Sequence, residues 1–155
     1  LVSQGDQIIY QKSFGLANRE FGIKNEEDTK FRIASLSKTF TALLIMQLAQ
    51  EGELALEDRI SEHLPWYRKD VGYSVSIHDL LRMNSGIPTY SSYWDFTTDI
   101  VMLDVEPIEY IKNYCSGALT FEPGGTTYLY SNSNYYILGA IIEAAAHLSA
   151  ILGAN

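Results

Sequence analysis

Ser35 and Lys38 stand three residues apart at the start of an apolar segment, and this spacing can make a serine hydroxyl reactive. The hydroxyl is a weak nucleophile near neutral pH, so covalent catalysis needs a neighbouring base to accept its proton. Residues three apart on a helix share one face, with about 5–6 Å between their Cβ atoms, so the lysine amine can reach back to the hydroxyl. The pair predicts an activated serine nucleophile.

The segment that follows this pair is predicted to form a helix. Residues 39–51 read as an apolar helix that ends at Gly52, so the pair stands at a helix amino terminus. The unpaired backbone N–H groups of such a terminus point toward any oxyanion that develops there. The same Ser-x-x-Lys spacing also occurs by chance, with the serine as a helix cap and the lysine in solvent, so the pair alone leaves both interpretations open.

Further stretches of the chain favour the catalytic interpretation of this pair over chance spacing. Tyr130-Ser131-Asn132 has a Tyr-x-Asn form, and the serine lies in the sequence Phe31-Arg32-Ile33-Ala34-Ser35-Leu36-Ser37-Lys38. On these motifs, and on residues 80–88 and 121–125, the chain resembles the penicillin-recognising serine hydrolases from Ile8 to about Glu143. That family includes class C β-lactamases, D-alanyl-D-alanine carboxypeptidases and esterases on the same scaffold. The Tyr-x-Asn form is closest to the class C and esterase branch.

The resemblance implies a role for each motif residue. Ser35 would attack an acyl carbonyl, Lys38 and Tyr130 would share the transfer of its proton, and Asn132 would hold the substrate amide. A phenol acts as a base only when its pKa falls well below about 10, which a nearby lysine ammonium favours. Whether Lys38 or Tyr130 is the base stays open, as does the choice among a β-lactam, a D-alanyl peptide and a small ester.

A third motif of the family, Lys-Thr-Gly or a His-x-Gly variant, has no match in the sequence. Residues 12–15 have a similar composition, but they precede the nucleophile, and we interpret them as structural. In family members, the strand that carries this motif also supplies the second oxyanion-hole N–H group. Loss of one such donor typically lowers the rate by about 10²–10³, so we expect impaired turnover without this motif. A binding or assembly protein on the same scaffold, in which Ser35 acylates and stalls or serves only structure, is therefore the alternative function.

The expected fold is α+β, of the β-lactamase/transpeptidase type, with a helical region, a partial antiparallel sheet and the C-terminal sheet strands absent. The 155 residues suffice for one core but are fewer than the family's usual architecture uses, so we expect a fragment. We predict a single partial domain with a strand hairpin over residues 1–15, a central helix over 35–52 and a mainly helical region over 53–155. An isolated hairpin is marginal in water, so its open edge predicts a homo-oligomer or a domain swap.

Helical periodicity gives further expectations for the elements that position the motifs. Helices are predicted over residues 39–51, 56–64 and 76–84, from Pro107 to near Gly117, and over 133–146. The first has a nearly unbroken apolar face, so we expect deep burial, and the last would anchor the Tyr130 loop. In the loop over residues 89–98, Tyr90, Tyr93 and Trp94 would either line a substrate pocket or simply cover the core.

The composition of the chain argues against several classes of binding partner. The net charge of −8 and the absence of a basic run argue against nucleic acid, and no apolar run reaches the roughly eighteen residues of a membrane span. A small-molecule or peptide substrate is the expected partner. His63, His78 and His147 lack the spacing of a metal site, and no phosphate-binding glycine loop is present, so we expect neither a metal nor an organic cofactor.

The cellular compartment stays open on the sequence. Cys115 is the single cysteine, so it excludes an internal disulfide but does not distinguish an oxidising from a reducing compartment. The family resemblance favours a periplasmic or extracellular location and leaves a cytoplasmic one open.

Overall fold

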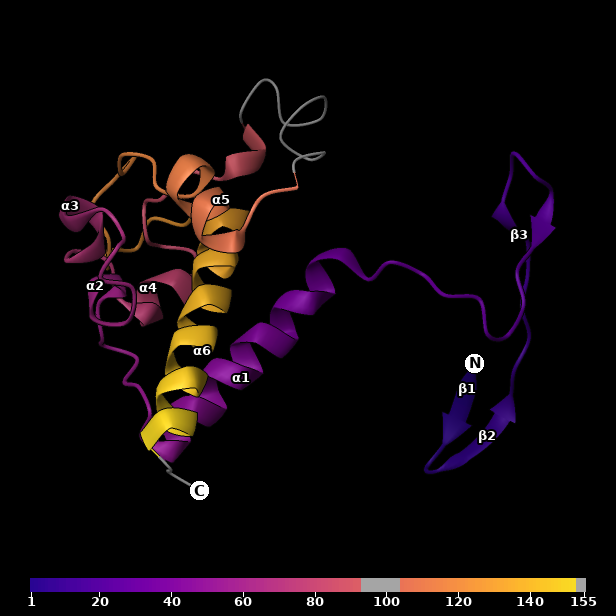
Figure 1. Cartoon of the computed structure of the whole chain (residues 1–155). Helices are drawn as coiled ribbons and strands as arrows, with labels where there is room; N and C mark the ends of the chain where they lie inside the picture. The colour runs from indigo at the N-terminus through magenta and orange to yellow at the C-terminus, as the bar shows by residue number, and fades with distance from the viewer. Residues whose placement is uncertain (93–103, 153–155) are drawn as a thin grey trace. The chain divides into compact units, whose positions relative to one another are not determined.

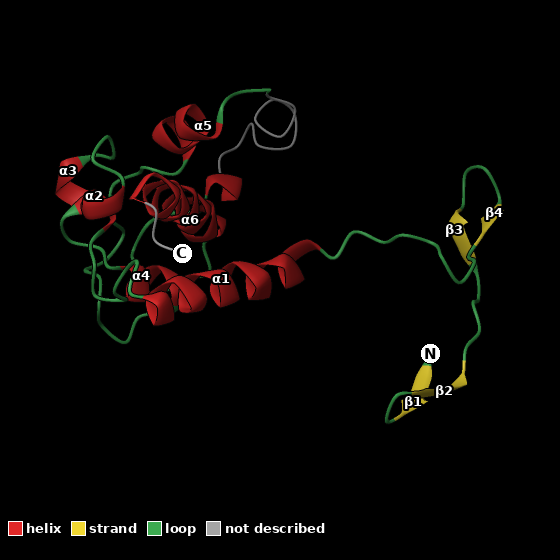
Figure 2. Ribbon diagram, turned by 60° about the horizontal axis from the view of Figure 1, so that its bottom comes forward, coloured by secondary structure: helices red, strands yellow, loops and turns green. Residues whose placement is uncertain are grey.

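The computed structural model describes residues 1–92 and 104–152. The chain divides into two compact units, Leu1–Ala34 and Ser35–Asn155, which are described separately. Figure 1 follows the chain from its N-terminus to its C-terminus, and Figure 2 separates its helices from its strands. That the two units form a single domain stays a prediction.

The first unit holds two small antiparallel sheets. Their strands are β1 (Val2–Gln4) with β2 (Gln7–Tyr10), and β3 (Leu16–Asn18) with β4 (Ile23–Lys24). Gly5 turns between β1 and β2 with a φ of 58°, a left-handed conformation that glycine adopts without a steric cost. The predicted hairpin is confirmed. The β3–β4 hairpin was not predicted, because strands of two or three residues are too short to show a period-two pattern.

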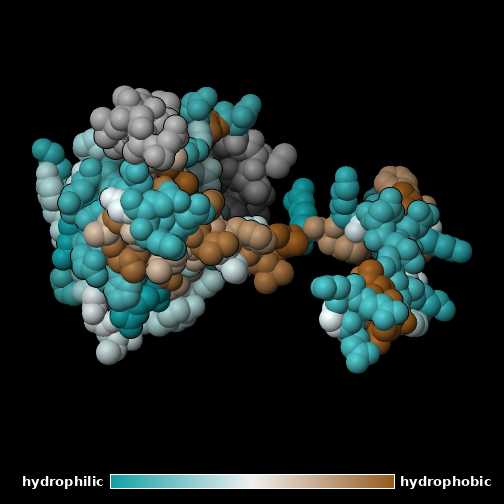
Figure 3. Space-filling view, turned by 90° about the horizontal axis from the view of Figure 1, so that it is seen from below, coloured by the Kyte–Doolittle hydropathy of each residue, from teal (hydrophilic) through white to brown (hydrophobic). Residues whose placement is uncertain are grey.

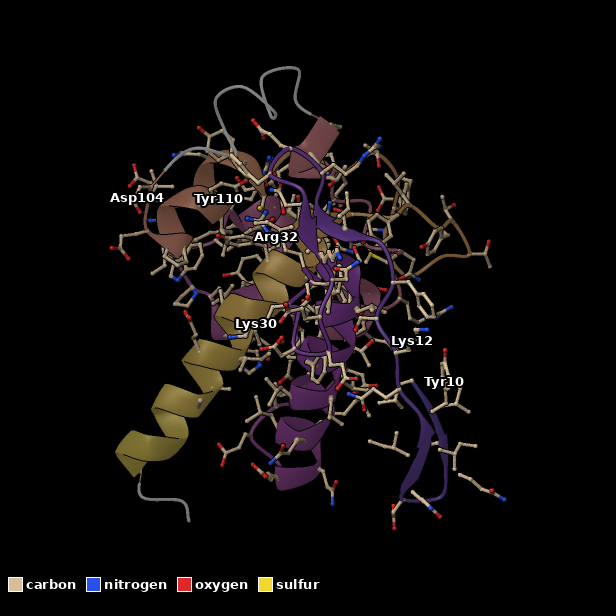
Figure 4. The ribbon with its side chains drawn as sticks, turned by 90° about the vertical axis from the view of Figure 1, so that its right-hand side faces the viewer. Tyr10, Lys12, Lys30, Arg32, Asp104 and Tyr110 are labelled. Carbon is tan, nitrogen blue, oxygen red and sulfur yellow. The ribbon has the colours of Figure 1, made fainter. Side chains whose placement is uncertain are left out.

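Every residue of β1 and β2 is exposed, including Ile8, Ile9 and Tyr10. Tyr10 and Lys12 are labelled in Figure 4 on this part of the chain. Two strands bury too little apolar surface to be stable alone in water. That the hairpin needs further partners stays a prediction.

The second unit is helical. Its α-helices are α1 (Ser37–Glu51), α2 (Ile60–His63), α3 (Lys69–Gly72), α4 (Ile77–Leu81), α5 (Pro107–Tyr114) and α6 (Asn132–Leu152), with 3₁₀ turns at Ala34–Leu36 and Tyr90–Ser92. α6 packs against α1, α2, α4 and α5. Its residues Ile137, Leu138 and Ile141 are fully buried and lie in the same core as Ile45 of α1. The start of α6 is therefore held in place by the main core of the chain.

Two helix ends follow the sequence signals closely. Gly52 ends α1 in a left-handed conformation with a φ of 79°, and its N–H reaches the carbonyl oxygens of the last turn. At the start of α4, the Asp79 N–H donates to Ser76 Oγ (3.1 Å) and the Ser76 N–H donates to Asp79 Oδ2 (3.0 Å). This reciprocal capping box is the arrangement that a serine followed three residues later by an acid predicts.

The expected deep burial of α1 is wrong for most of its apolar face. Ile45 is the buried residue of this helix, while Phe40 and Leu43 are 62% and 64% exposed. Leu44 and Met46 are also exposed. The physical reason is that α1 packs against α6 along one side, and its other apolar side chains stay at the surface. Figure 3 shows hydrophobic residues at the molecular surface in brown.

Gly86 fixes the turn between α4 and the loop that follows it. Its φ is 76°, and a Cβ added there would stand 2.2 Å from the Phe121 carbonyl oxygen. Its own carbonyl oxygen accepts the Thr120 N–H at 2.8 Å. We expect Gly86→Ala to lower the free energy of unfolding by about 2–4 kcal/mol, because the left-handed conformation and the close backbone contact both oppose a side chain.

Urea unfolding followed by circular dichroism measures this change. Gly139→Ala is the matched control, because Gly139 lies inside α6 and an added Cβ would meet nothing within 4 Å. The control is expected to raise the free energy of unfolding by about 0.5–1 kcal/mol. Equal stability of Gly86→Ala and the unmodified protein would contradict the argument.

Candidate active site

Ser35 lies in the 3₁₀ turn just before α1, with its hydroxyl beside two of the predicted partners. Its Oγ is 2.7 Å from the Tyr130 hydroxyl oxygen and accepts a hydrogen bond from Lys38 Nζ at 3.3 Å. The preceding residue, Ala34, has a φ of 45°, which is unusual for a residue with a side chain. Such strained conformations concentrate at functional sites. The structure thus brings the three predicted catalytic residues together.

Lys38 is half-buried and makes polar and aromatic contacts. Besides Ser35, its Nζ donates to Asn132 Oδ1 at 2.8 Å. The same nitrogen lies over the rings of Tyr130 and Tyr135, 4.9 Å and 5.6 Å from their centroids. A lysine cation is attracted to the faces of aromatic rings, so these contacts hold the side chain at the serine. Tyr135 carried no signal of this role in the sequence.

The Tyr130 hydroxyl has a lowered pKa. The Lys38 side chain, through hydrogen bonding, is the largest influence lowering the pKa of Tyr130 below its usual value, followed by the bond with Ser35, while partial burial opposes them. Tyr130 as a whole is 41% exposed. A phenol with a lowered pKa beside a serine hydroxyl has the chemistry of a general base.

Asn132 begins α6 and is tied to the loop after Pro88. Its backbone N–H donates to Thr89 Oγ1 at 3.1 Å, and its Nδ2 donates to Ser91 Oγ at 3.3 Å. Next to it, Ser133 Oγ accepts the Tyr90 N–H at 2.9 Å and donates to the Pro88 carbonyl oxygen at 2.8 Å. Sequence reasoning missed Thr89, Ser91 and Ser133. The signal for Thr89 and Ser91 was the hydroxyl-rich loop over residues 89–98, and Ser133 in α6 carried none.

Met83 supports the segment that carries Tyr130. It is buried, with a φ of 61°, and its carbonyl oxygen accepts the Leu129 N–H at 2.9 Å. Its Sδ accepts the Ser131 N–H at 3.4 Å and Asn134 Nδ2 at 3.7 Å. Contacts on both sides of Tyr130 therefore fix the backbone from which its side chain extends.

Tyr90 packs into an aromatic cluster. Its ring centroid lies 5.4 Å from that of Tyr110 and 6.0 Å from that of Tyr136, and Tyr110 stacks on Tyr136 at 4.8 Å. Tyr110, labelled in Figure 4, belongs to α5. Burial raises the pKa of Tyr90. The substrate-binding role of this residue stays a prediction, and Tyr93 and Trp94 lie outside the described residues.

Among the side chains that the structure describes, over residues 1–92 and 104–146, no three or more His, Cys, Asp or Glu are grouped as metal ligands would be. Over residues 1–92 and 104–152, no helix has the length and hydrophobicity needed to span a bilayer.

The chain is similar to known proteins along nearly its whole length. The Beta-lactamase family model matches residues 1–154. Protein flp of Staphylococcus aureus (strain NCTC 8325 / PS 47) is 32% identical over 147 residues, or 92% of this chain and 28% of flp. Esterase EstB of Burkholderia gladioli is 33% identical over an aligned length of 157, which covers 94% of this chain and 40% of EstB. The chain thus spans well under half of each relative.

Solved structures give the same result for the fold. The penicillin binding protein from Bacillus halodurans superposes with a TM-score of 0.76 and 31% identity, over 94% of this chain and 44% of that one. The octameric penicillin-binding protein homologue from Pyrococcus abyssi has a TM-score of 0.69 and 30% identity, over 91% of this chain and 33% of that one. The predicted α+β fold class is confirmed, and the chain belongs to the Beta-lactamase family, of whose fold it contains a part.

Proposed function

We propose that the protein is a serine acyl-transfer enzyme, or the nucleophile-bearing part of one, that works through an acyl-enzyme on Ser35. The observation that carries this proposal is the contact of Ser35 Oγ with both the Tyr130 hydroxyl and Lys38 Nζ, at 2.7 Å and 3.3 Å. A nucleophile within hydrogen-bond reach of a base, which is itself oriented by a third group, is the arrangement that covalent catalysis requires.

The proposed reaction has two steps, the acylation of Ser35 and its later deacylation by water. Ser35 Oγ attacks the substrate carbonyl carbon while its proton passes to the Tyr130 phenolate or to the Lys38 amine. The resulting intermediate then collapses, the bond from carbon to the leaving nitrogen or oxygen breaks, and the proton moves to the leaving group. Water later attacks the ester on Ser35, which releases the acid and restores the serine hydroxyl.

Three features of the site would stabilise and orient the substrate. The N-terminal turn of α1 presents backbone N–H groups near Ser35, where the oxyanion develops. Asn132 Nδ2 carries two N–H groups, of which Ser91 accepts one, and we propose the other for a substrate carbonyl oxygen. Tyr90 would add an aromatic wall, as its position one residue before Ser91 suggests.

The substrate class is proposed from the relatives. Similarity to an esterase and to a penicillin binding protein supports a small ester, a β-lactam or a D-alanyl peptide as the acyl donor. The alternative is a protein that acylates and then stalls.

Assembly with a second copy remains part of the proposal. The exposed strands β1 and β2 support pairing through an open sheet edge, either in a homo-oligomer or by a domain swap.

The test of the proposed function is intact-mass spectrometry after brief incubation with a penicillin and, separately, with a reactive nitrophenyl ester, followed by peptide mapping. A transient adduct on Ser35 with accumulating product would support an acyl-enzyme hydrolase. A stable adduct would support the stalled alternative. If neither reagent forms an adduct on Ser35, the proposal is wrong.

The lowered pKa of Tyr130 predicts a pH dependence of acylation. A base must be deprotonated to accept the serine proton, so the rate rises with pH and levels off below the usual phenol pKa of about 10. Tyr130→Phe is expected to remove this rise and to lower the plateau rate by about 10². Rates of acylation by the nitrophenyl ester, measured across the pH range, test both effects.

Tyr128→Phe is the matched control for this prediction. Tyr128 is 66% exposed and stands two residues before Tyr130, so its loss should leave the pH profile unchanged. Retention of the same pH-dependent rise in Tyr130→Phe would show that another group is the base.

A further inference from the structure

The carboxamide of Asn132 is held between two different kinds of partner. Its Oδ1 accepts from Lys38 Nζ at 2.8 Å, and its Nδ2 donates to Ser91 Oγ at 3.3 Å. The N–H groups of Lys38 Nζ donate to the amide oxygen that faces them, whereas a serine hydroxyl can accept from the amide N–H. The orientation of the carboxamide in the structure therefore satisfies both of its ends.

Thr89 completes the arrangement on the loop side. Its Oγ1 lies 2.9 Å from Ser91 Oγ and accepts the Asn132 backbone N–H at 3.1 Å. The two hydroxyl groups therefore contact each other, and each also contacts Asn132, one at the backbone and one at the side chain. Both residues are partly buried, which limits competition from water.

We propose that Ser91, supported by Thr89, is a positioning residue that fixes the Asn132 carboxamide and, through it, Lys38 at Ser35. This inference rests on the proposed acylation of Ser35. Successive contacts of 3.3, 2.8 and 3.3 Å connect Ser91 to Asn132, Asn132 to Lys38, and Lys38 to Ser35.

The terminal torsion of an asparagine has a broad energy profile, so a carboxamide bonded at one end can rotate. Without the Ser91 hydroxyl, the amide oxygen would spend less time facing Lys38. The N–H group that we propose for the substrate would also lose its fixed direction. Both effects would slow acylation, although Ser91 itself does not touch the reacting atoms.

The first test compares Ser91→Ala with Ser91→Thr, which keeps the hydroxyl. The rate constant for adduct formation with a nitrophenyl ester should fall about fivefold in Ser91→Ala, the effect of losing one neutral hydrogen bond, and should stay within about twofold in Ser91→Thr. Ser92→Ala is the matched control. It removes a hydroxyl from the same loop, but that hydroxyl donates to the backbone carbonyl oxygen of Thr89 and not to the side chain of Thr89 or Asn132. It should leave the rate constant unchanged.

A second readout does not depend on activity. The side-chain amide resonances of Asn132, recorded by ¹⁵N NMR, should shift and exchange faster with solvent in Ser91→Ala and should stay unchanged in Ser92→Ala. If the unmodified protein is acylated but Ser91→Ala acylates equally fast, the positioning role is wrong. If the unmodified protein forms no adduct, the proposed function fails, and unchanged Asn132 resonances in Ser91→Ala would then overturn the positioning role by themselves.

Discussion

Ser35→Ala is expected to abolish covalent labelling by both a penicillin and a nitrophenyl ester. Acylation forms a bond from the carbonyl carbon to the serine oxygen, and alanine has no atom that can take its place. In the structure, the Tyr130 hydroxyl lies 2.7 Å from Ser35 Oγ and Lys38 Nζ lies 3.3 Å from it. Intact-mass spectra before and after incubation measure the result directly.

Ser37 provides a matched control for this experiment. It is an exposed serine two residues later, at the first position of α1, so Ser37→Ala makes the same chemical change close to the site. Labelling should persist in Ser37→Ala and disappear in Ser35→Ala. An adduct that forms on Ser35→Ala at an undiminished rate would exclude Ser35 as the nucleophile.

Lys38→Ala is expected to slow acylation by about 10³–10⁴. The change removes the donor to Ser35 Oγ and the donor to Asn132 Oδ1, and it also removes the largest influence that lowers the pKa of Tyr130. The rate constant for adduct formation measures the effect. A rate within about tenfold of the unmodified protein would contradict a direct role of Lys38.

Two further lysine variants test whether the effect is specific to Lys38 and whether it comes from the charge or from a base. Lys112→Ala controls for the loss of a lysine beside aromatic residues, because Lys112 Nζ lies 5.4 Å from the ring centroid of Trp66. Lys38→Arg keeps a positive charge that cannot act as a base. If Lys38→Arg retains much of the rate, Tyr130 is the base and Lys38 supplies charge; if it is as slow as Lys38→Ala, a base role for Lys38 is favoured.

The pairing of Ser35 with Lys38 could be predicted from the sequence because it is local. A separation of three residues at a helix start places the two side chains together whatever the rest of the chain does. Ser35 meets Tyr130 across 95 residues and Lys38 meets Asn132 across 94, and these contacts have no local signal; only the resemblance between motifs indicated them.

Other features could not be predicted because they depend on how distant segments meet. The hydroxyl groups of Thr89 and Ser91 reach Asn132 across more than forty residues, and loops carry no periodicity from which such a contact can be inferred. Periodicity did show that one face of α1 is apolar. It could not show what covers that face, and Phe40 is in fact 62% exposed.

The burial of Ile45 bears on the geometry around Ser35 although Ile45 lies well away from that residue. Ile45 follows Lys38 by seven residues, so the two side chains project from α1 in almost the same direction, about 10 Å apart along its axis. Each residue of a helix advances the rotation by about 100°. The isoleucine, locked among the side chains of α6, therefore sets the rotational phase of α1. A slip of one residue at that distant contact would turn Ser35 and Lys38 together away from Tyr130 and Asn132, so the packing of the core determines whether these four side chains meet.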